Sequence, residues 1–424
     1  MPTMQFHVPG ANRALAMATI AFAANFSVWT LYAVLALELQ GKFDLSATQL
    51  GLFFSAPVFT GAIGRIPAGI LAERYNPKTI YTCQMLLAAP PLFMLPYIET
   101  LWGYMWLGLW IGLSGTSFTI GIRYVTDWFD SQRQGTAMGV FGAGNTGAAI
   151  TLALAPFLVE RWGWSSLGPI YGAGLILMAL SFALLAPKNK NTVTVLQSTL
   201  TPMEAIRDIR VWRFGLYYYF VFGSFLALLL WLPQYYVSAY NLNFPQAMAF
   251  TLFFVATSSM VRALGGWFAD RYGGRAVNWT VFWICLVCLF FLSYPRTTMT
   301  IHGVHQDVQL QIEVNVWLFT ALIFVIGIAQ GFGRASVYKT IHDYFPQQMG
   351  LVGGMVAAIG ALGGCTLPIL FGLAVDIIGI HTACFMVLYS VLAACMIVMF
   401  FANKADRFQR RVQHAATHNF LEDE

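Results

Sequence analysis

Long apolar segments alternate with short polar connections along nearly the whole chain. Twelve of these segments are apolar enough, and at about 20 residues long enough, to cross a bilayer as a helix. They cover residues 13–37, 50–72, 79–98, 102–126, 135–158, 167–187, 213–237, 246–269, 276–295, 315–338, 350–375 and 380–402. The pattern predicts an all-α polytopic membrane protein with twelve transmembrane helices.

The composition also indicates a membrane protein rather than a soluble one. Of the 424 residues, 58% are hydrophobic and only 10% are charged, whereas a soluble domain carries about 25% charged residues. So few charges could not cover the surface of a water-soluble fold of this size. We therefore expect a bilayer as the main partner of this chain, and no nucleic acid.

The basic residues lie unevenly on the two sides that these segments define. If both termini share one side, 16 of the 23 Lys and Arg residues fall on that side, 3 fall on the other and 4 lie inside spans. The positive-inside rule then places both termini and the connection 188–212 in the cytoplasm. We expect a multi-pass protein of the cytoplasmic (inner) membrane.

Two stretches of sequence recur six spans apart. Residues 65–75 and 262–272 share an arginine, a glycine four positions later and an Ala-acid-Arg-Tyr ending, at an offset of 197. Residues 123–129 and 339–345 share a basic residue, an aspartate four positions later and a final aromatic pair, at an offset of 216. Because six is an even number of spans, the repeat is parallel, about an axis along the membrane normal.

The repeat divides the chain at its longest polar interruption. The expected parts are a six-helix half (1–187), a cytoplasmic linker (188–212), a second six-helix half (213–402) and a cytoplasmic tail (403–424). Such a pair of halves is the plan of the major facilitator superfamily.

The loops that close the first repeat strengthen this resemblance. Glu73 and Arg74 in one copy, and Asp270, Arg271 and Arg275 in the other, resemble the signature loop of that superfamily. In that loop an acid and bases clasp neighbouring helix ends on the cytoplasmic side. The resemblance implies a major facilitator fold, transport by alternating access and a monomer.

Four basic residues lie inside the predicted spans, and two of them occupy equivalent positions in the repeat. Arg65 and Arg262 fall near the middle of the second and eighth spans, where each costs about 2.5–3.5 kcal/mol to insert. No acidic residue lies in the middle of any span. Two arginines facing each other across a central cavity would repel, and a bound anion would remove that cost. The planar forks of guanidinium groups suit flat, oxygen-bearing anions.

The remaining candidates belong to gating or coupling. Arg123 and Lys339 precede aspartates by one helical turn, a spacing that favours local ion pairs near the cytoplasmic mouth. Arg334 lies deeper, where it could line the cavity. Spans five and eleven are rich in small residues, which let helices approach closely and slide. The glycines of interest are Gly144, Gly147, Gly360, Gly363 and Gly364.

A narrower resemblance rests on two glycine-rich runs. Residues 142–147 and 360–368 are similar to the two signatures of the nitrate/nitrite porter family, and the setting of Phe118 and the run 222–225 also fit that family. In that family the two arginines bind the substrate, aromatic rings sandwich its plane, and the signature asparagine orients it. The resemblance implies a substrate site made of Arg65, Arg262, Asn145, Phe118, Tyr218 and Phe222.

These observations predict a secondary transporter of nitrate, and of nitrite as a second small planar anion, with no cofactor, no metal site and no enzymatic activity. The run 334–339 resembles the proton-coupled branch of the family, which favours nitrate/proton symport. Three alternatives stay open. They are nitrate/nitrite exchange, transport of another small anion such as a monocarboxylate, and a nitrate-binding membrane sensor.

Overall fold

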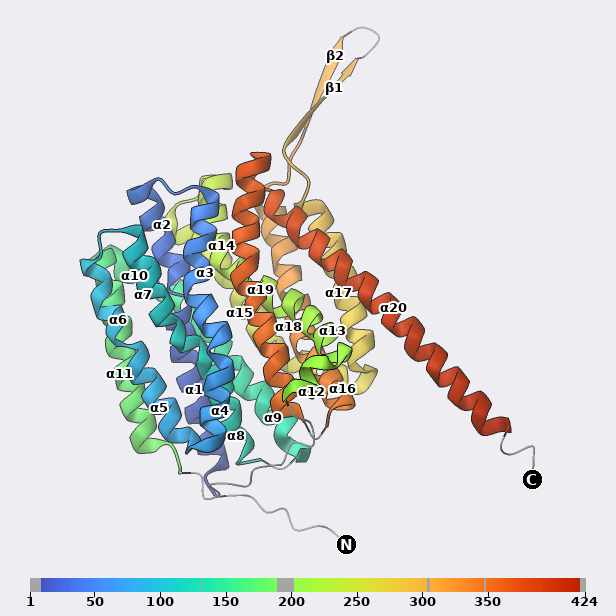
Figure 1. The fold of residues 1–424 in the computed structure, drawn as a ribbon. Helices are drawn as coiled ribbons and strands as arrows, with labels where there is room; N and C mark the ends of the chain where they lie inside the picture. Colours follow the sequence, from blue (N-terminus) through green and yellow to red (C-terminus); the bar gives the residue numbers. More distant parts are fainter. Residues whose placement is uncertain (1–8, 130, 189–201, 303–305, 347, 420–424) are drawn as a thin grey trace.

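The computed structural model describes residues 9–129, 131–188, 202–302, 306–346 and 348–419, and within them the side chains outside 131–136, 202–203, 350 and 406–419. In this part of the chain nearly every residue is helical, and the helices lie side by side in one bundle (Figure 1). The predicted linker falls mostly on residues 189–201, which lie outside the described part.

The elements follow one another in chain order. They are α1 (Ala11–Trp29), α2 (Tyr32–Phe43), α3 (Ala47–Ile63), α4 (Arg65–Arg74), α5 (Pro77–Ala88), α6 (Pro90–Met94), η1 (Leu95–Tyr97), α7 (Leu101–Ile111), η2 (Gly112–Thr116), α8 (Ser117–Thr126), α9 (Ser131–Gly142), η3 (Ala143–Thr146), α10 (Gly147–Trp162), η4 (Trp164–Ser166), α11 (Leu167–Leu185), α12 (Pro202–Arg207), α13 (Ile209–Tyr218), η5 (Tyr219–Ser224), α14 (Phe225–Tyr240), α15 (Phe244–Met260), α16 (Arg262–Tyr272), α17 (Gly274–Leu292), β1 (Thr297–His302), β2 (Asp307–Ile312), α18 (Val316–Tyr344), α19 (Met349–Ile378) and α20 (Ala383–Asn419).

These elements account for the predicted spans with one exception. Ten helical stretches of the described chain are long and apolar enough to cross a membrane, and the bent pair α15–α16 makes an eleventh. The remaining segment, 79–98, is divided into α5, α6 and η1, because Pro90 and Pro91 interrupt it. The helical membrane fold is confirmed, while the twelfth span stays a prediction.

Several spans carry an irregular turn near their middle. The α3–α4 span breaks at Gly64, and α15–α16 bends by 40° at Val261. Short 3₁₀ turns interrupt the spans at η2 and η3, and η5 is a π-helical turn. Irregular backbone at membrane depth is tolerated where it is buried in protein or lines a cavity. These turns therefore mark the depth at which a site should be sought.

The two parts of the chain lie on opposite sides of the bundle. In Figure 1 the blue to green helices α1–α8 and α11 lie on one side, and α16, α17 and α20 on the other. Contacts between the sides run mainly through α3 with α19, α10 with α15 and α2 with α14. The division into two repeated halves stays a prediction.

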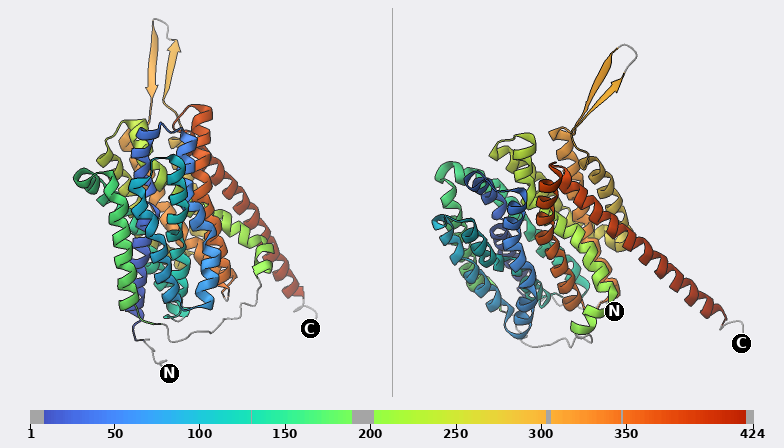
Figure 2. Two further views of the ribbon diagram at one scale, coloured as in Figure 1. Left: turned by 60° about the vertical axis from the view of Figure 1, so that its left-hand side comes forward. Right: turned by 45° about the horizontal axis from the view of Figure 1, so that its top comes forward.

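A β-hairpin, absent from the predicted all-helical plan, projects from one end of the bundle (Figure 2). The register pairs Met299 with Leu310 and Ile301 with Val308, so apolar side chains share one face of the ribbon. Alternation of polar and apolar residues in both strands is the sequence signal for it. We call the end of the bundle from which the hairpin projects the hairpin end. The connection between α2 and α3 lies at the same end.

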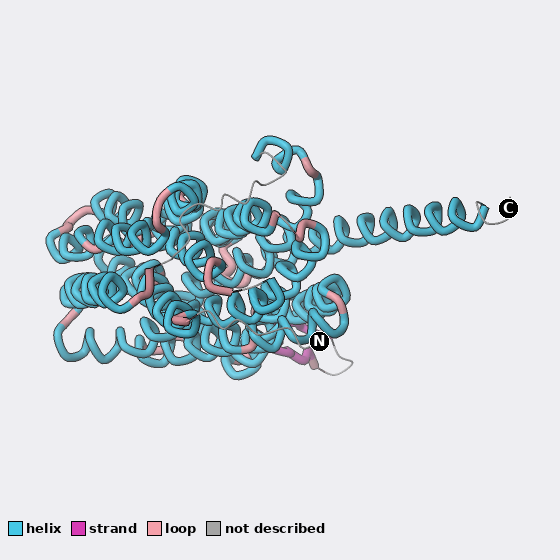
Figure 3. The backbone as a smooth tube through the Cα atoms, turned by 90° about the horizontal axis from the view of Figure 1, so that it is seen from below, coloured by secondary structure: helices cyan, strands magenta, loops and turns pink. Residues whose placement is uncertain are grey.

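The opposite end carries most of the charged side chains and is called the basic end. Its basic residues include Arg74, Lys78, Arg123, Arg213, Arg271, Arg275 and Lys339. Viewed from this end, α20 continues well beyond the bundle (Figure 3).

Helices α3 and α19 close the bundle at the hairpin end. A side chain in place of Gly51 would lie 2.2 Å from the Pro368 carbonyl oxygen, so the two backbones are in direct contact. The Asp376 carboxylate of α19 accepts bonds from the backbone nitrogens of Ala47 and Thr48 at 3.1 and 2.9 Å and from the Thr48 hydroxyl at 2.6 Å. This carboxylate caps the N-terminus of α3 and ties the two sides together.

Removal of the Asp376 carboxylate should allow α3 and α19 to separate at the hairpin end. Cys365 of α19 lies against α3 and is only 5% exposed, so it can report opening. We predict that Asp376→Ala raises the alkylation rate of Cys365 about tenfold, since a lost helix cap costs about 1–2 kcal/mol. Peptide mass spectrometry after maleimide treatment measures this rate.

The matched control is Asp307→Ala, which removes a carboxylate from the same end but from the exposed hairpin. It should leave the rate unchanged. Equal Cys365 reactivity in the Asp376→Ala variant and the parent would show that the cap does not hold the end closed.

Candidate functional site

The two predicted arginines begin the second helix of two bent spans. Arg65 is the first residue of α4, directly after the break at Gly64, and Arg262 is the first residue of α16, directly after Val261. They are 3% and 7% exposed. The positions that match in the sequence repeat thus occupy matching positions in the backbone.

Arg65 lies in a cage of aromatic rings. Its guanidinium carbon is 5.4 Å from the ring centre of Phe118, 5.5 Å from Phe222 and 5.6 Å from Trp29. One terminal nitrogen donates to the Ala357 carbonyl at 2.8 Å. Ring faces attract a cation within about 6 Å, so these contacts offset part of the desolvation of the charge.

Arg262 approaches the same cage from the other side. Its guanidinium carbon is 6.0 Å from the ring centre of Phe118, so this one ring lies close to both arginines. A side chain in place of Gly142 would lie 2.9 Å from that guanidinium carbon. The lack of a side chain at Gly142, in the glycine-rich run 142–147, therefore leaves the space that Arg262 occupies.

Asn145 links Arg262 to a third arginine. Its amide is oriented with the oxygen towards the guanidinium groups, because only this orientation pairs an acceptor with donors. The oxygen then accepts from Arg334 at 3.1 Å and from Arg262 at 3.2 Å. The sequence predicted that this amide acts on the anion directly; the structure places its oxygen on the two arginines.

Arg334 is fully buried, at 0% exposure, and is bonded on all sides. It donates to the Gln330 carbonyl at 3.3 Å and to the backbone and hydroxyl oxygens of Ser258 at 2.5 and 2.7 Å. Its guanidinium also lies 4.0 Å from the ring centre of Phe225. The sequence left open whether Arg334 lines the cavity; the structure makes it a fixed positive charge beside Arg262.

The remaining aromatic candidates lie together. The rings of Tyr218 and Phe222 are stacked at 5.2 Å and 15°, and Tyr338 meets Tyr218 edge-on at 5.2 Å. Phe222 belongs to the π-helical turn η5, a distortion that is frequent at functional sites. The adjacent tyrosine Tyr219 instead bonds Thr366 at 2.6 Å, so Tyr218 is the tyrosine that joins this group.

The glycines of spans five and eleven form close helix contacts within each side of the bundle. Side chains in place of Gly144 and Gly147 would collide with α1, at Phe22 and at the Ala23 carbonyl. Side chains in place of Gly360, Gly363 and Gly364 would collide with span seven, at Tyr218, Tyr219 and Leu226. The glycines thus bring the helices that carry the site residues into contact.

The charged residues at the basic end form the predicted local ion pairs. Arg123 pairs with Asp127, and Lys339 lies 3.3 Å from Asp343 and 3.4 Å from Asp270. Through Asp270, the second signature loop is joined to α18.

The other residues of the signature loops are exposed or lie over rings. Arg271 lies 5.5 Å from the ring centre of Trp267, and Arg275 lies 5.0 Å from that of Tyr344. Glu73 and Arg74 are exposed on the last turn of α4 and form no ion pair with a described residue.

A cavity between the two sides lies at the hairpin end, with Gln40 and Leu50 from one side and Gln234 and Tyr235 from the other. His381 also lines it, and its burial and the nearby Arg296 lower the pKa of its imidazole. This histidine therefore contributes no fixed positive charge there at neutral pH.

The buried side chains around the central site carry charges of one sign only. Among the residues whose burial is described, the fully buried ionised groups are Arg65, Arg262 and Arg334, and no buried Asp or Glu accompanies them. Three guanidinium groups without a buried acid make the site attractive to an anion.

Comparison with known proteins agrees with this fold. The family model of the Major Facilitator Superfamily matches residues 17–305. A Thermus thermophilus protein named "Probable nitrate/nitrite antiporter NarK1" is 33% identical over 96% of this chain and 94% of its own length. A "Nitrite extrusion protein" from Bacillus subtilis is 26% identical over 94% of this chain and 96% of its own.

The chain belongs to the nitrate/nitrite porter family of the Major Facilitator Superfamily. The family predicted from the sequence motifs is confirmed. This porter also shares its fold with a solved bacterial homologue of the human lysosomal transporter Spinster in an inward-facing and occupied conformation. That match has a TM-score of 0.70 at 14% identity and covers 94% of this chain and 97% of the other.

Sequence reasoning missed three residues that complete the arginine surroundings. Trp29 lies over Arg65, Phe225 lies over Arg334, and Ser258 accepts from Arg334. Ser258 precedes Arg262 by four residues, so it lies on the same helix face, and this spacing could have indicated it. Nothing in the sequence marks Trp29 among the other tryptophans of the chain.

The bridging role of Asn145 can be tested with two substitutions. We predict that Asn145→Ala lowers nitrate affinity about tenfold or more, because a hydrogen bond to a charged group contributes about 1.5–3 kcal/mol. We predict that Asn145→Asp weakens nitrate binding further, because a buried carboxylate would neutralise part of the positive charge. Binding of nitrate to the purified porter measures both effects.

The thermal stability of the two variants shows whether Asn145 acts through its hydrogen bonds with Arg262 and Arg334 or only by filling space. Asn145→Asp should unfold at a higher temperature than Asn145→Ala, because it keeps an acceptor for both arginines. Equal affinity for nitrate in the parent and both variants would remove Asn145 from the site.

Proposed function

We propose that this porter carries nitrate, and nitrite as a second substrate, across the cytoplasmic membrane by alternating access, with the anion held between Arg65 and Arg262. The observation that carries the proposal is the pair of guanidinium groups within 6.0 Å of the Phe118 ring centre, in a buried site without a buried acid among the described residues. The names of its relatives from Thermus thermophilus and Bacillus subtilis support the same substrates.

The shape of the surroundings favours a small planar anion. Each guanidinium group supplies a planar fork, and the rings of Phe118 and Phe222 supply flat faces. A tetrahedral anion such as phosphate would need donors above and below the plane, where aromatic rings lie. A larger monocarboxylate is a second substrate candidate, which the close packing of Gly142 and Gly360 around the site disfavours.

The coupling mode follows from electrostatics. Moving one negative charge into a cell at −100 mV costs about 2.3 kcal/mol, so accumulation of nitrate needs a second flux. Exchange of nitrate for nitrite moves no net charge. Symport with more than one proton instead uses the same potential as a driving force.

We infer that exchange is the mode that the site geometry supports best, because proton symport needs a titrating group and the fully buried described residues include no carboxylate. Proton symport, which the run 334–339 favours, is the second candidate. The carboxylates paired with Lys339 at the basic end are candidate groups for it.

The orientation and assembly of the porter are part of the proposal. The uneven distribution of basic residues supports an inner-membrane protein with both termini in the cytoplasm, so that the basic end faces inward. We propose that one chain is sufficient for transport, because Arg65 and Arg262 come from different parts of the same chain and both lie near Phe118.

The two-arginine site predicts that positive charge alone is not enough to bind nitrate tightly. Arg65→Lys and Arg262→Lys should each lower nitrate affinity at least about tenfold, because a lysine keeps the charge but cannot supply the planar fork. Isothermal titration with nitrate measures the loss. The matched control is Arg123→Lys at the basic end, which should keep near-normal affinity, and near-normal affinity in either site variant would contradict the proposed site.

Uptake of labelled nitrate into proteoliposomes distinguishes the coupling modes. We predict rapid uptake when the lumen contains nitrite, and little uptake from an inward proton gradient alone. Uptake driven by the proton gradient with an empty lumen would establish symport instead. A sensor, in contrast, would bind nitrate and transport it under neither condition.

A further inference from the structure

A second cluster of arginines surrounds a cavity at the basic end, away from the central site. The cavity is small and partly open to the surface. Its walls come from α13, α17, α18 and α20, all in the C-terminal part of the chain. The lining residues are Arg213, Phe214, Tyr217, Arg275, Asn278, Val337, Thr340, Met399, Ala402 and Asn403.

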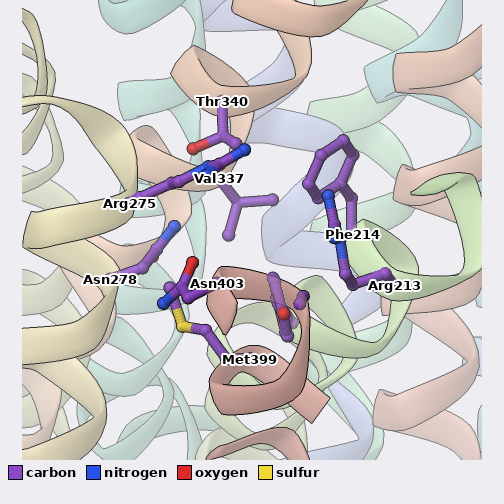
Figure 4. A pocket seen from close by; sticks show the side chains of 10 residues that line it. Arg213, Phe214, Arg275, Asn278, Val337, Thr340, Met399 and Asn403 are labelled. Atoms are coloured by element: carbon purple, nitrogen blue, oxygen red, sulfur yellow. The ribbon is translucent and has the colours of Figure 1, made fainter. Parts of the chain in front are cut away.

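Arg213 and Arg275 reach this cavity from different helices (Figure 4). The Nε atom of Arg213 is buried and has no hydrogen-bond partner among the described residues. The guanidinium carbons of Arg210, Arg213 and Arg275 lie 5.4, 5.9 and 5.0 Å from the ring centre of Tyr344. Three positive charges thus gather around one ring, at a place suited to a further negatively charged group.

Neutral polar side chains complete the lining. Asn278 accepts from the Ser336 hydroxyl through its amide oxygen at 2.8 Å, which leaves its NH₂ group as a donor. Thr340 and Asn403 also line the cavity, and Asn403 belongs to α20, one residue beyond the last predicted span. The Thr340 hydroxyl already donates to the Ser336 carbonyl at 2.9 Å, so the donors that remain for an oxyanion include Nε of Arg213 and the NH₂ group of Asn278.

The helices beside the cavity present large apolar side chains outward. On α13, Ile209 and Trp212 are 77% and 53% exposed, and on α20, Phe400 and Phe401 are 55% and 62% exposed. In a membrane such side chains contact acyl chains, and an exposed tryptophan at a helix end is typical of the headgroup level. The arginines therefore lie where a bilayer places its phosphate groups.

We propose that this cavity is a binding site for the phosphate of an anionic phospholipid, whose acyl chains lie against α13 and α20. Basic pockets between transmembrane helices are suited to anionic headgroups, and each basic residue contributes about 1 kcal/mol near an anionic surface. The exposed apolar side chains favour a lipid over a soluble anion, since a soluble anion would gain nothing from them. The lipid would tie α13 and α20 to α18, the helix that carries Arg334.

The test compares lipids on the purified full-length porter. Phosphatidylglycerol, phosphatidylcholine or inorganic phosphate is added in neutral detergent, and the unfolding temperature is recorded together with lipid retention by native mass spectrometry. We expect phosphatidylglycerol to stabilise the parent. Its apparent affinity should fall about fivefold in Arg213→Gln and about thirtyfold when Arg275→Gln is added.

The single variant keeps the test informative, because Arg275 has further contacts whose loss could disturb the fold. Arg74→Gln, which removes an exposed arginine from the same end, should leave the lipid effect unchanged. Unaltered phosphatidylglycerol affinity in Arg213→Gln and in the double variant would overturn the proposal. Equal stabilisation by inorganic phosphate would also overturn it, in favour of a soluble anion.

Discussion

The structure depends on three guanidinium groups buried in the middle of a membrane bundle with no buried carboxylate among the described residues. Each costs several kcal/mol to place there unless the protein solvates it. Backbone carbonyls and ring faces do so: Arg65 donates to Ala357 and Arg334 to Gln330 and Ser258, while aromatic rings cover both. The irregular turns in the middle of the spans follow from this need, since they place such groups at the right depth.

The same contacts join the two sides of the bundle in a crossed manner. Arg65, from the N-terminal part, donates to Ala357 of the C-terminal part, while Arg262, from the C-terminal part, donates to Asn145 of the N-terminal part. Each of these two arginines thus donates a hydrogen bond to the other part of the chain, and Arg65 also donates to the Gly115 carbonyl of its own part at 3.4 Å. In this structure the centre of the bundle is therefore tied across its two parts, and a bound anion would replace or strengthen these ties on both sides at once.

How much the sequence could predict varied with the kind of signal. The apolar pattern predicted eleven of the twelve spans in a form that the structure supports, and the offset between Arg65 and Arg262 predicted their equivalent places in the backbone. The resemblance to the porter family indicated Phe118, Phe222 and Asn145, which lie around the arginines.

The remaining features of the site depend on contacts between residues far apart in the sequence, which the hydrophobic pattern does not indicate. Ala357 enters the site through its carbonyl, which every residue has, so its type carries no signal. The direction of the Asn145 amide is decided by Arg334, which lies nearly two hundred residues away. The hairpin was missed because its strands are short and its alternation lies in a connection between two strongly apolar helices.

The third arginine, Arg334, bears on how the porter would carry an anion across the membrane. Arg334 is fixed by four hydrogen-bond partners and a ring, so its charge is present in the empty and the loaded site alike. A site loaded with nitrate and one loaded with nitrite carry the same net charge, so their conformational change meets the same electrostatic cost. An empty site carries one more uncompensated positive charge through a low-dielectric bundle, which raises its barrier. A permanent excess of arginines therefore favours a porter that changes conformation only when an anion is bound, and this favours exchange without any titrating group in the site.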